Sequence, residues 1–283
     1  MGLGALPPSA ILSATLSVSG RPQLPRAPLA EAIVEVRWRL AGVGPVQLGP
    51  GVLGDPGYAM SVGRLYERIR TRFPAIEDLP AAAVPEQMTP HVVRHRFRAS
   101  PGGWPCVQLG PGVATVNFTA EYSWSSFRET VLWVLPQIEQ AYEGVRALSP
   151  EFVLLRYVNA IPFNVSSADV LSFLPEKLHV AVTLPEAIAR YQSRAGAPDG
   201  FIARVGLPLS RPRGTGAIQV ATGVRDNEPS LVWEQSMSSK SPHAPSIAAI
   251  GESWLDEAHA VMEDWFFALI DGDLETRFME ATL

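Results

Sequence analysis

The residues best suited to chemistry lie in the run VLLRYVNA, residues 153–160, which has the composition of a buried β-strand. One charged residue, Arg156, interrupts this run, and Tyr157 and Asn159 follow it closely. A guanidinium group binds carboxylates and phosphates through several hydrogen-bond donors. Because a buried guanidinium without a partner is costly, Arg156 is expected beside a carboxylate, backbone carbonyls or a bound anion. A structural carboxylate partner and a ligand-anchoring role both satisfy this requirement.

Arg37 lies in a similar run, IVEVRWRL, and is followed by an aromatic residue, as Arg156 is. Strict alternation of apolar and polar residues predicts a half-buried strand here. The alternation places Arg37 on the polar face, so we expect its guanidinium to be solvated. Arg37 is nevertheless a second candidate for binding an anion.

His259 is the histidine that an active site with Arg156 would use, and it lies in a predicted final helix. Helical spacing puts it on the same face as Leu255 and Met262. On such an apolar face we expect a packed histidine that is hydrogen-bonded to a neighbour. A catalytic role is the alternative.

The sequence predicts no metal site and no cofactor. His91 and His95 are four residues apart, but no further ligand at a characteristic spacing accompanies them. Cys106, the only cysteine, lies in an apolar run and is expected to be an inert core thiol. A single cysteine also excludes an intrachain disulfide.

Arginines give the clearest charged pattern. Three recur at four-residue spacing on a helix predicted near 60–73, and three alternate on a strand predicted within 91–100. These residues are Arg64, Arg68, Arg72, Arg94, Arg96 and Arg98. Together they would form a patch suited to phosphates, although aromatic residues for base stacking are not interleaved with them. A solvated face, or a docking surface for the acidic C-terminal segment, is the structural interpretation.

Charge is distributed unevenly along the chain, whose net charge is −5. Residues 1–100 carry more basic than acidic residues, whereas residues 101–283 carry an excess of acidic ones. This asymmetry indicates either a polyanionic partner for the first part or contact between the two ends, within or between subunits.

Known catalytic and membrane signals are missing from the sequence. It contains no nucleophile elbow, no phosphate-binding P-loop and no dinucleotide-binding glycine motif. Its apolar runs are too short for a membrane-spanning helix, and its first residues lack the basic start of a signal peptide. The sequence therefore predicts a cytoplasmic protein without a membrane partner.

The order of predicted elements defines an α+β protein. Residues 1–27 are expected to form a flexible or docking N-terminal arm. Strand, helix, meander and helix then occur twice, in 28–148 and in 149–283, which suggests two pseudo-repeated halves of one compact body. We expect a curved antiparallel sheet with long helices, near 124–143 and 252–270, packed on one face.

Four segments carry a resemblance to a known family. They are PLAEAIVEVRW near the start, VNFTAEYSWSSF, LLRYVNAIPF at mid-chain, and WLDEAHAVMEDWFFALI near the end. Their order and spacing resemble those of a sporadically distributed family of bacterial hypothetical proteins, over most of the chain. The resemblance implies no activity, cofactor or catalytic residue. A patchy distribution is typical of genes that move horizontally, including those of defence or mobile-element clusters.

Three hypotheses for function follow. The preferred one is a non-enzymatic binding or assembly protein whose self-association weakens in high salt or on deletion of residues 1–27. The second is a nucleic-acid-associated module that uses the six arginines. The third is an enzyme or small-ligand binder in which Arg156 anchors an anion and Tyr157, Asn159 or His259 lies beside it. This last hypothesis requires those side chains to converge on one pocket.

Overall fold

The computed structural model describes residues 21, 24–42, 53–119, 121–165, 168–189 and 200–280. Within these residues nine strands form one sheet, and every pair of neighbours in it is antiparallel. In order across the sheet they are β4 (Ala75–Asp78), β5 (His95–Arg98), β6 (Cys106–Gly110), β7 (Val113–Phe118), β1 (Leu29–Trp38), β8 (Pro150–Pro162), β11 (Glu228–Lys240), β10 (Arg213–Arg225) and β9 (Ile202–Ser210). The short strands β2 (Ala41–Gly42) and β3 (Leu53–Gly54) pair separately. The predicted α+β class and antiparallel sheet are confirmed.

The longer helices are α1, α2 and α6, and shorter helical segments connect the strands. The helices are α1 (Tyr58–Ile69), α2 (Trp124–Ala141), α3 (Val170–Lys177), α4 (Glu186–Ala189), α5 (Ile247–Ala249), α6 (Leu255–Ile270) and α7 (Asp273–Met279), and the single turns are η2 (Pro80–Ala83), η3 (Glu86–Met88) and η4 (Ile250–Trp254). Ser123 caps α2, because its side chain accepts a hydrogen bond from the backbone N–H of Ser126 at 3.2 Å. No helix within the described ranges is long and apolar enough to cross a membrane.

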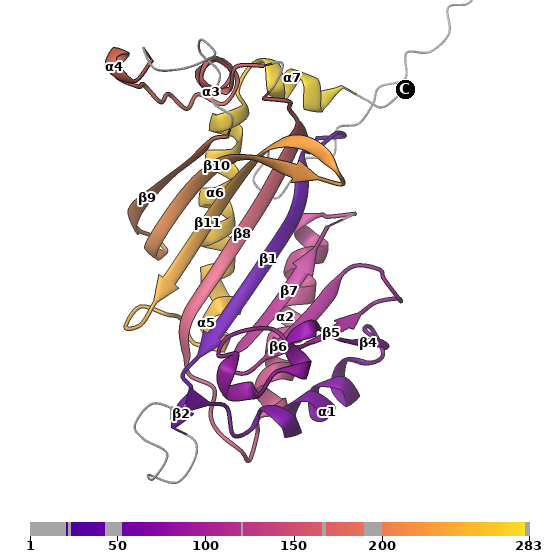
Figure 1. The fold of residues 1–283 in the computed structure, drawn as a ribbon. Coiled ribbons are helices and arrows are strands. Elements are labelled where there is room, and N and C mark those ends of the chain that lie inside the picture. The colour runs from indigo at the N-terminus through magenta and orange to yellow at the C-terminus, as the bar shows by residue number, and fades with distance from the viewer. Residues whose placement is uncertain are drawn as a thin grey trace, which may run out of the picture.

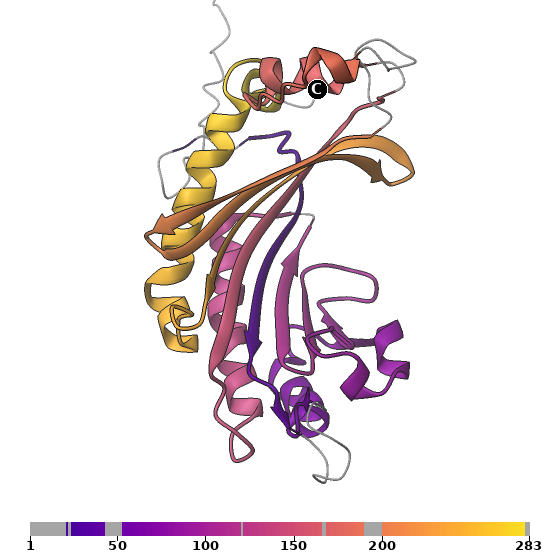
Figure 2. The same cartoon turned by 60° about the vertical axis from the view of Figure 1, so that its left-hand side comes forward.

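Alternation along β1 divides the sheet into two faces. Val34, Val36 and Trp38 point to one side and join a buried apolar cluster with residues of α1, α2 and α6. Figures 1 and 2 show α2 and α6 running along this side of the twisted sheet. We call this side the helix face. The other side, which carries Ile33 and Glu35, is called the opposite face.

The sheet is arranged alike on both sides of its central pair, β1 and β8. Outward from β1 the order is β7, β6 and β5, and outward from β8 it is β11, β10 and β9 (Figure 1). β7, the last strand of the series β4 to β7, therefore lies beside β1. In the same way β11, the last strand of the series β9 to β11, lies beside β8. The short strand β4 extends the first half by one edge strand.

The segment before β1 meets the C-terminal helices. Arg21 forms an ion pair with Asp264 at 3.2 Å, and Arg26 forms one with Glu280 at 3.6 Å. The backbone N–H of Arg26 also donates to the carbonyl of Phe278. Two basic residues before β1 thus pair with acidic residues of the C-terminal segment within one molecule. Most of the predicted N-terminal arm, residues 1–20 with 22 and 23, lies outside the described residues.

Candidate functional site

Arg156 lies on the opposite face near the middle of the sheet, with Ile33 and Ser236 as its cross-strand neighbours. Its side chain is 34% exposed, and its Nη1 lies 3.7 Å from Oε2 of Glu234. Its Nε is buried and has no hydrogen-bond partner within the described chain. Glu234 therefore supplies the carboxylate neighbour that a half-buried guanidinium needs, although the distance indicates a weak pair. This geometry favours the structural interpretation of Arg156.

Arg37 lies on the opposite face as well and is held by local contacts. Its Nε donates to Oε1 of Glu35 at 2.5 Å, and its guanidinium lies 5.2 Å from the centre of the Phe152 ring. These contacts account for Arg37 as a half-exposed surface residue with a carboxylate and an aromatic neighbour.

Tyr157 points to the helix face and belongs to a chain of polar side chains. The hydroxyl of Tyr122 donates to the Tyr157 hydroxyl at 3.1 Å, and the Tyr157 hydroxyl lies 3.0 Å from Nδ1 of His259. The His259 ring stacks on Trp124, with ring centroids 3.7 Å apart. The expectation of a packed histidine bonded to a neighbour matches this arrangement. Tyr122 lies in one of the motifs that carry the family resemblance, but its spacing alone gave no sign of this contact.

Burial sets the protonation state of this chain. Desolvation lowers the pKa of His259 to about 4, although the carboxylate of Asp256 acts in the other direction. Desolvation also raises the pKa of Tyr122 and that of Tyr157 above the ordinary value for tyrosine. His259 is therefore neutral at pH 7. None of the three groups titrates near pH 7, as an efficient general acid or base would.

The side chains required by the enzyme hypothesis divide between two faces. Tyr157, Asn159 and His259 lie between the sheet and α6, whereas Arg156 projects from the other side of the same strand. The physical reason is the two-residue repeat of a strand, which sends adjacent residues to opposite faces. The structure therefore does not bring Arg156 into one pocket with Tyr157 and His259.

A polar network crosses the opposite face from β5 to β1. Nε of Arg96 donates to Oε1 of Gln108 at 3.2 Å. Nε2 of Gln108 in turn donates to Thr115 at 3.2 Å and to Oδ1 of Asn117 at 3.0 Å. The amide of Asn117 donates to Glu31 at 2.8 Å. Gln108 is thus a buried glutamine whose amide is fully bonded.

A contrasting set of buried polar side chains lies on the helix face. Trp233 pairs with Asn159 across β11 and β8, and Gln235 pairs with Tyr157. Within the described chain, hydrogen-bond partners are missing for Asn159 Nδ2, for Trp233 Nε1 and for both amide atoms of Gln235. Asn159 and Gln235 lie in their strands between residues of the apolar cluster around Tyr157 and residues of a second cluster that includes Trp233. No motif or periodic pattern in the sequence distinguishes Trp233 or Gln235 from ordinary strand residues.

Replacing Gln235 by methionine is expected to leave the free energy of unfolding unchanged or to raise it. The reason is that an apolar side chain of similar size removes two buried polar atoms without breaking a hydrogen bond. The matched variant Gln108→Met should lose about 1–3 kcal/mol, because it breaks bonded partners in the network on the opposite face. Urea unfolding of both variants measures the difference. Equal losses would show that the Gln235 amide has a partner in solution.

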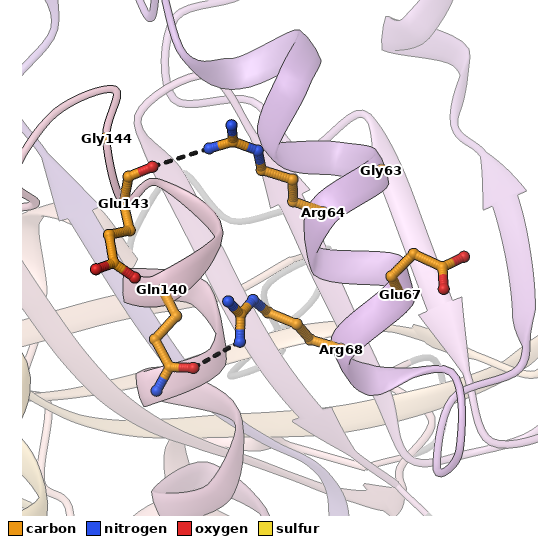
Figure 3. A pocket seen from close by; sticks show the side chains of 7 residues that line it. All are labelled: Gly63, Arg64, Glu67, Arg68, Gln140, Glu143 and Gly144. Carbon is orange, nitrogen blue, oxygen red and sulfur yellow. Dashed lines mark hydrogen bonds between the residues drawn. The ribbon is translucent and has the colours of Figure 1, made fainter.

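The arginines of α1 are directed at α2. Arg64 and Arg68 line a shallow cleft of about 660 Å³ between α1 and the C-terminal end of α2. Figure 3 shows both guanidinium groups directed across this cleft. Nη1 of Arg64 donates to the carbonyl of Glu143 at 2.9 Å, and Nη1 of Arg68 donates to Oε1 of Gln140 at 2.6 Å. Arg72 follows the end of α1. Its Nη1 donates to Oε1 of Glu129 at 3.2 Å, and its guanidinium lies 4.8 Å from the centre of the Trp133 ring.

The arginines on and beside β5 have different partners. Arg94 donates to the carbonyl of Val84 at 2.7 Å, and Glu77 forms ion pairs with both Arg96 and Arg98. Phe97, which lies between Arg96 and Arg98, belongs to the core shared with α1. Arg96 and Arg98 therefore project from the opposite face, away from α1. The six arginines do not form the single patch that the sequence suggested. The sheet separates Arg96 and Arg98 from α1, and Arg94 contacts Tyr58 at the start of α1.

The remaining sequence candidates are accounted for by local contacts. Nδ1 of His91 lies 3.0 Å from the carbonyl of Gly112, whereas Nδ1 of His95 lies 2.8 Å from Asp78. Among the described residues no cluster of three histidine, cysteine or acidic side chains could hold a metal ion. Burial raises the pKa of the Cys106 thiol to about 12, so this cysteine is unreactive at neutral pH.

The two edges of the sheet differ strongly. At one edge β4 has four residues, two of them acidic, and Pro74 precedes it. At the other edge β9 has nine residues, and the exposed fractions of Ile202, Val205 and Leu207 are 71%, 49% and 42%. Short strands, charged residues and prolines protect an edge against further strand pairing. β9 carries one charged residue, Arg204, and one proline, Pro208, but it is longer and more apolar than β4. The sequence predicted a strand here but could not place it at an edge.

The geometry defines an α+β protein with a twisted antiparallel sheet, no metal-binding cluster among the described residues, and one long edge strand with exposed apolar side chains. No protein-family model matches the chain, and neither a curated protein nor a solved structure shows significant similarity to it. The family resemblance therefore depends on the sequence motifs alone.

Proposed function

We propose that this protein is a non-enzymatic binding and assembly protein, and that it binds another polypeptide strand along β9. The observation that carries this proposal is the long edge strand with exposed Ile202, Val205 and Leu207. Strand addition to such an edge gives affinity through main-chain hydrogen bonds and specificity through alternate side chains. The contrast with the short, acidic strand β4 supports β9 as the edge that is used.

The placement of the polar candidates supports a binding role over a catalytic one. Arg156 has Glu234 as its ionic neighbour, and Tyr157 and His259 lie on the other face in an uncharged, buried chain. The six arginines have partners on two sides of the sheet, and the cleft that Arg64 and Arg68 line also contains Glu67 and Glu143. Nucleic-acid binding therefore has less support than assembly.

We further infer two pseudo-repeated halves, with the long helices on one face. The support is the mirrored strand order around β1 and β8. Glu35 and Leu154 face each other in the register of this pair, and Arg37 and Arg156 lie two residues beyond them in their own strands. A two-fold operation through this pair would exchange the two arginines. One half therefore already joins the other by antiparallel strand pairing.

Photo-cross-linking in cells that produce the protein tests strand binding. A photoreactive amino acid is introduced in place of Leu207 on β9, and in a matched variant in place of Ile76 on β4. Both side chains are exposed and each lies on an edge strand. We expect polypeptide adducts from position 207 and none from position 76, and we expect the additional change Val205→Lys to abolish them. Adducts of equal yield at both positions, or none at 207, would contradict the proposal.

A further inference from the structure

We infer that the strand bound along β9 is the β9 strand of a second copy of this chain, in an antiparallel pair related by a two-fold axis. This inference rests on the proposed function and names its partner. The evidence is the composition, length and charge of the edge strands β9 and β4, together with the register in which two β9 strands can pair.

The two edge strands of the described sheet favour a closed pair over an open array. A head-to-tail contact between β9 and the β4 strand of another molecule would repeat without closing and would build filaments. It would also place a nine-residue apolar strand on a four-residue strand that contains Glu77 and Asp78. Pairing of β9 with its own copy matches the strand lengths and closes after two molecules.

The midpoint of the strand sets the register. β9 runs from Ile202 to Ser210, so pairing over its full length places Gly206 opposite the same residue of the second copy. A two-fold axis perpendicular to the sheet then keeps each helix face continuous with that of the partner molecule. In this register Val205 faces Leu207 of the second copy on the helix face, and both side chains lose exposed apolar surface.

Charge is consistent with this register. Arg204 is the only charged residue of β9, and the central pairing at Gly206 places it opposite Pro208 of the second copy. A pairing centred on Arg204 would bring two guanidinium groups face to face, which is destabilising. The full-length register thus avoids the one like-charge contact that the strand could make.

Cysteine cross-linking tests the register directly. The side chain added in Gly206→Cys would meet its nearest neighbour, Thr215, at an ordinary contact distance of 3.7 Å, so the variant should fold. Directly opposed residues of antiparallel strands lie within disulfide range. Under mild oxidation we expect a covalent dimer of twice the 30.6 kDa chain mass. The control Gly223→Cys, exposed on β10, should stay monomeric, and buried Cys106 should not react.

Sedimentation equilibrium of the full chain tests the association itself. The wild type should form dimers, and Leu207→Lys should raise the dimer dissociation constant at least ~10-fold, equivalent to about 1.4 kcal/mol. The control Ile76→Lys should leave it unchanged. Because the contact is apolar and uses backbone bonds, added salt should not weaken it. Charge-driven association, as the sequence alone suggested, would instead weaken in salt.

The outcomes separate the two proposals. A monomeric wild type that gives cellular adducts at position 207 with another mass would overturn self-pairing and leave strand binding along β9 intact. A monomeric wild type without such adducts would overturn both. A dimer that is insensitive to Leu207→Lys, or that fails to cross-link through Gly206→Cys, would also refute pairing along β9 in this register.

Discussion

Replacing Asp55 by alanine is expected to lower the free energy of unfolding by about 3–5 kcal/mol. Asp55 is buried, and its Oδ2 accepts hydrogen bonds from Trp38 Nε1 at 2.9 Å, from the Tyr142 hydroxyl at 2.9 Å and from the backbone N–H of Gly112 at 3.2 Å. Nη1 of Arg146 lies 3.5 Å from its Oδ1. Alanine would leave three buried donors and a guanidinium without their acceptor.

The size of this effect can be checked by chemical unfolding with a matched control. Net stabilities of domains are about 5–15 kcal/mol, so the loss at Asp55 would remove a large part of the total. Asp78 is an aspartate with a mostly exposed side chain, and its described ionic contact is with His95. Asp78→Ala should change the free energy of unfolding by less than about 0.5 kcal/mol. A loss below 1 kcal/mol at Asp55 would show that its three bonds do not persist in solution.

Asp55 also illustrates what a sequence pattern leaves undetermined. It lies in a glycine- and proline-rich stretch between a strand and a helix, where an aspartate is ordinary turn chemistry. Its partners Trp38, Tyr142 and Gly112 are far away along the chain, and only the folded arrangement brings them to one carboxylate. Periodicity reports which way a side chain points within its own element, but not which element it meets.

Local patterns predicted the elements well, because periodicity reports how the side chains of one element are directed. The alternation in IVEVRWRL gave β1 and the side of Arg37, and the apolar run around Arg156 gave β8. The strand order, however, depends on pairings between distant segments. The exposure of β9 and the separation of Arg64 from Arg96 follow from that order, so neither could be read from spacing.

The mirrored order around β1 and β8 connects the fold with the proposed assembly. Within the chain, the two halves meet as antiparallel strands whose register is centred near Glu35 and Leu154. Self-pairing of β9 would repeat the same kind of contact between molecules, centred on Gly206. The sheet would then extend across both molecules, and among the described strands the two short, acidic β4 strands would form its edges.

The second large effect is expected from pH. An ordinary histidine has a pKa near 6.5, whereas burial holds that of His259 at about 4 in the folded protein. Between these values the unfolded chain binds a proton that the folded chain does not. Stability should therefore fall as the pH drops below about 6.5, and the full loss of about 3 kcal/mol should be reached near pH 4.

Comparing unfolding free energies of wild type and His259→Phe from pH 7 to pH 4 isolates this contribution. Phenylalanine can still stack on Trp124, and the variant lacks the titrating ring. The carboxylate of Asp256, which opposes the shift, is present in both proteins. The wild type should lose about 3 kcal/mol more than the variant over this range. Parallel profiles for wild type and His259→Phe would mean that His259 titrates normally, and the buried chain from Tyr122 through Tyr157 to His259 would then not exist in solution.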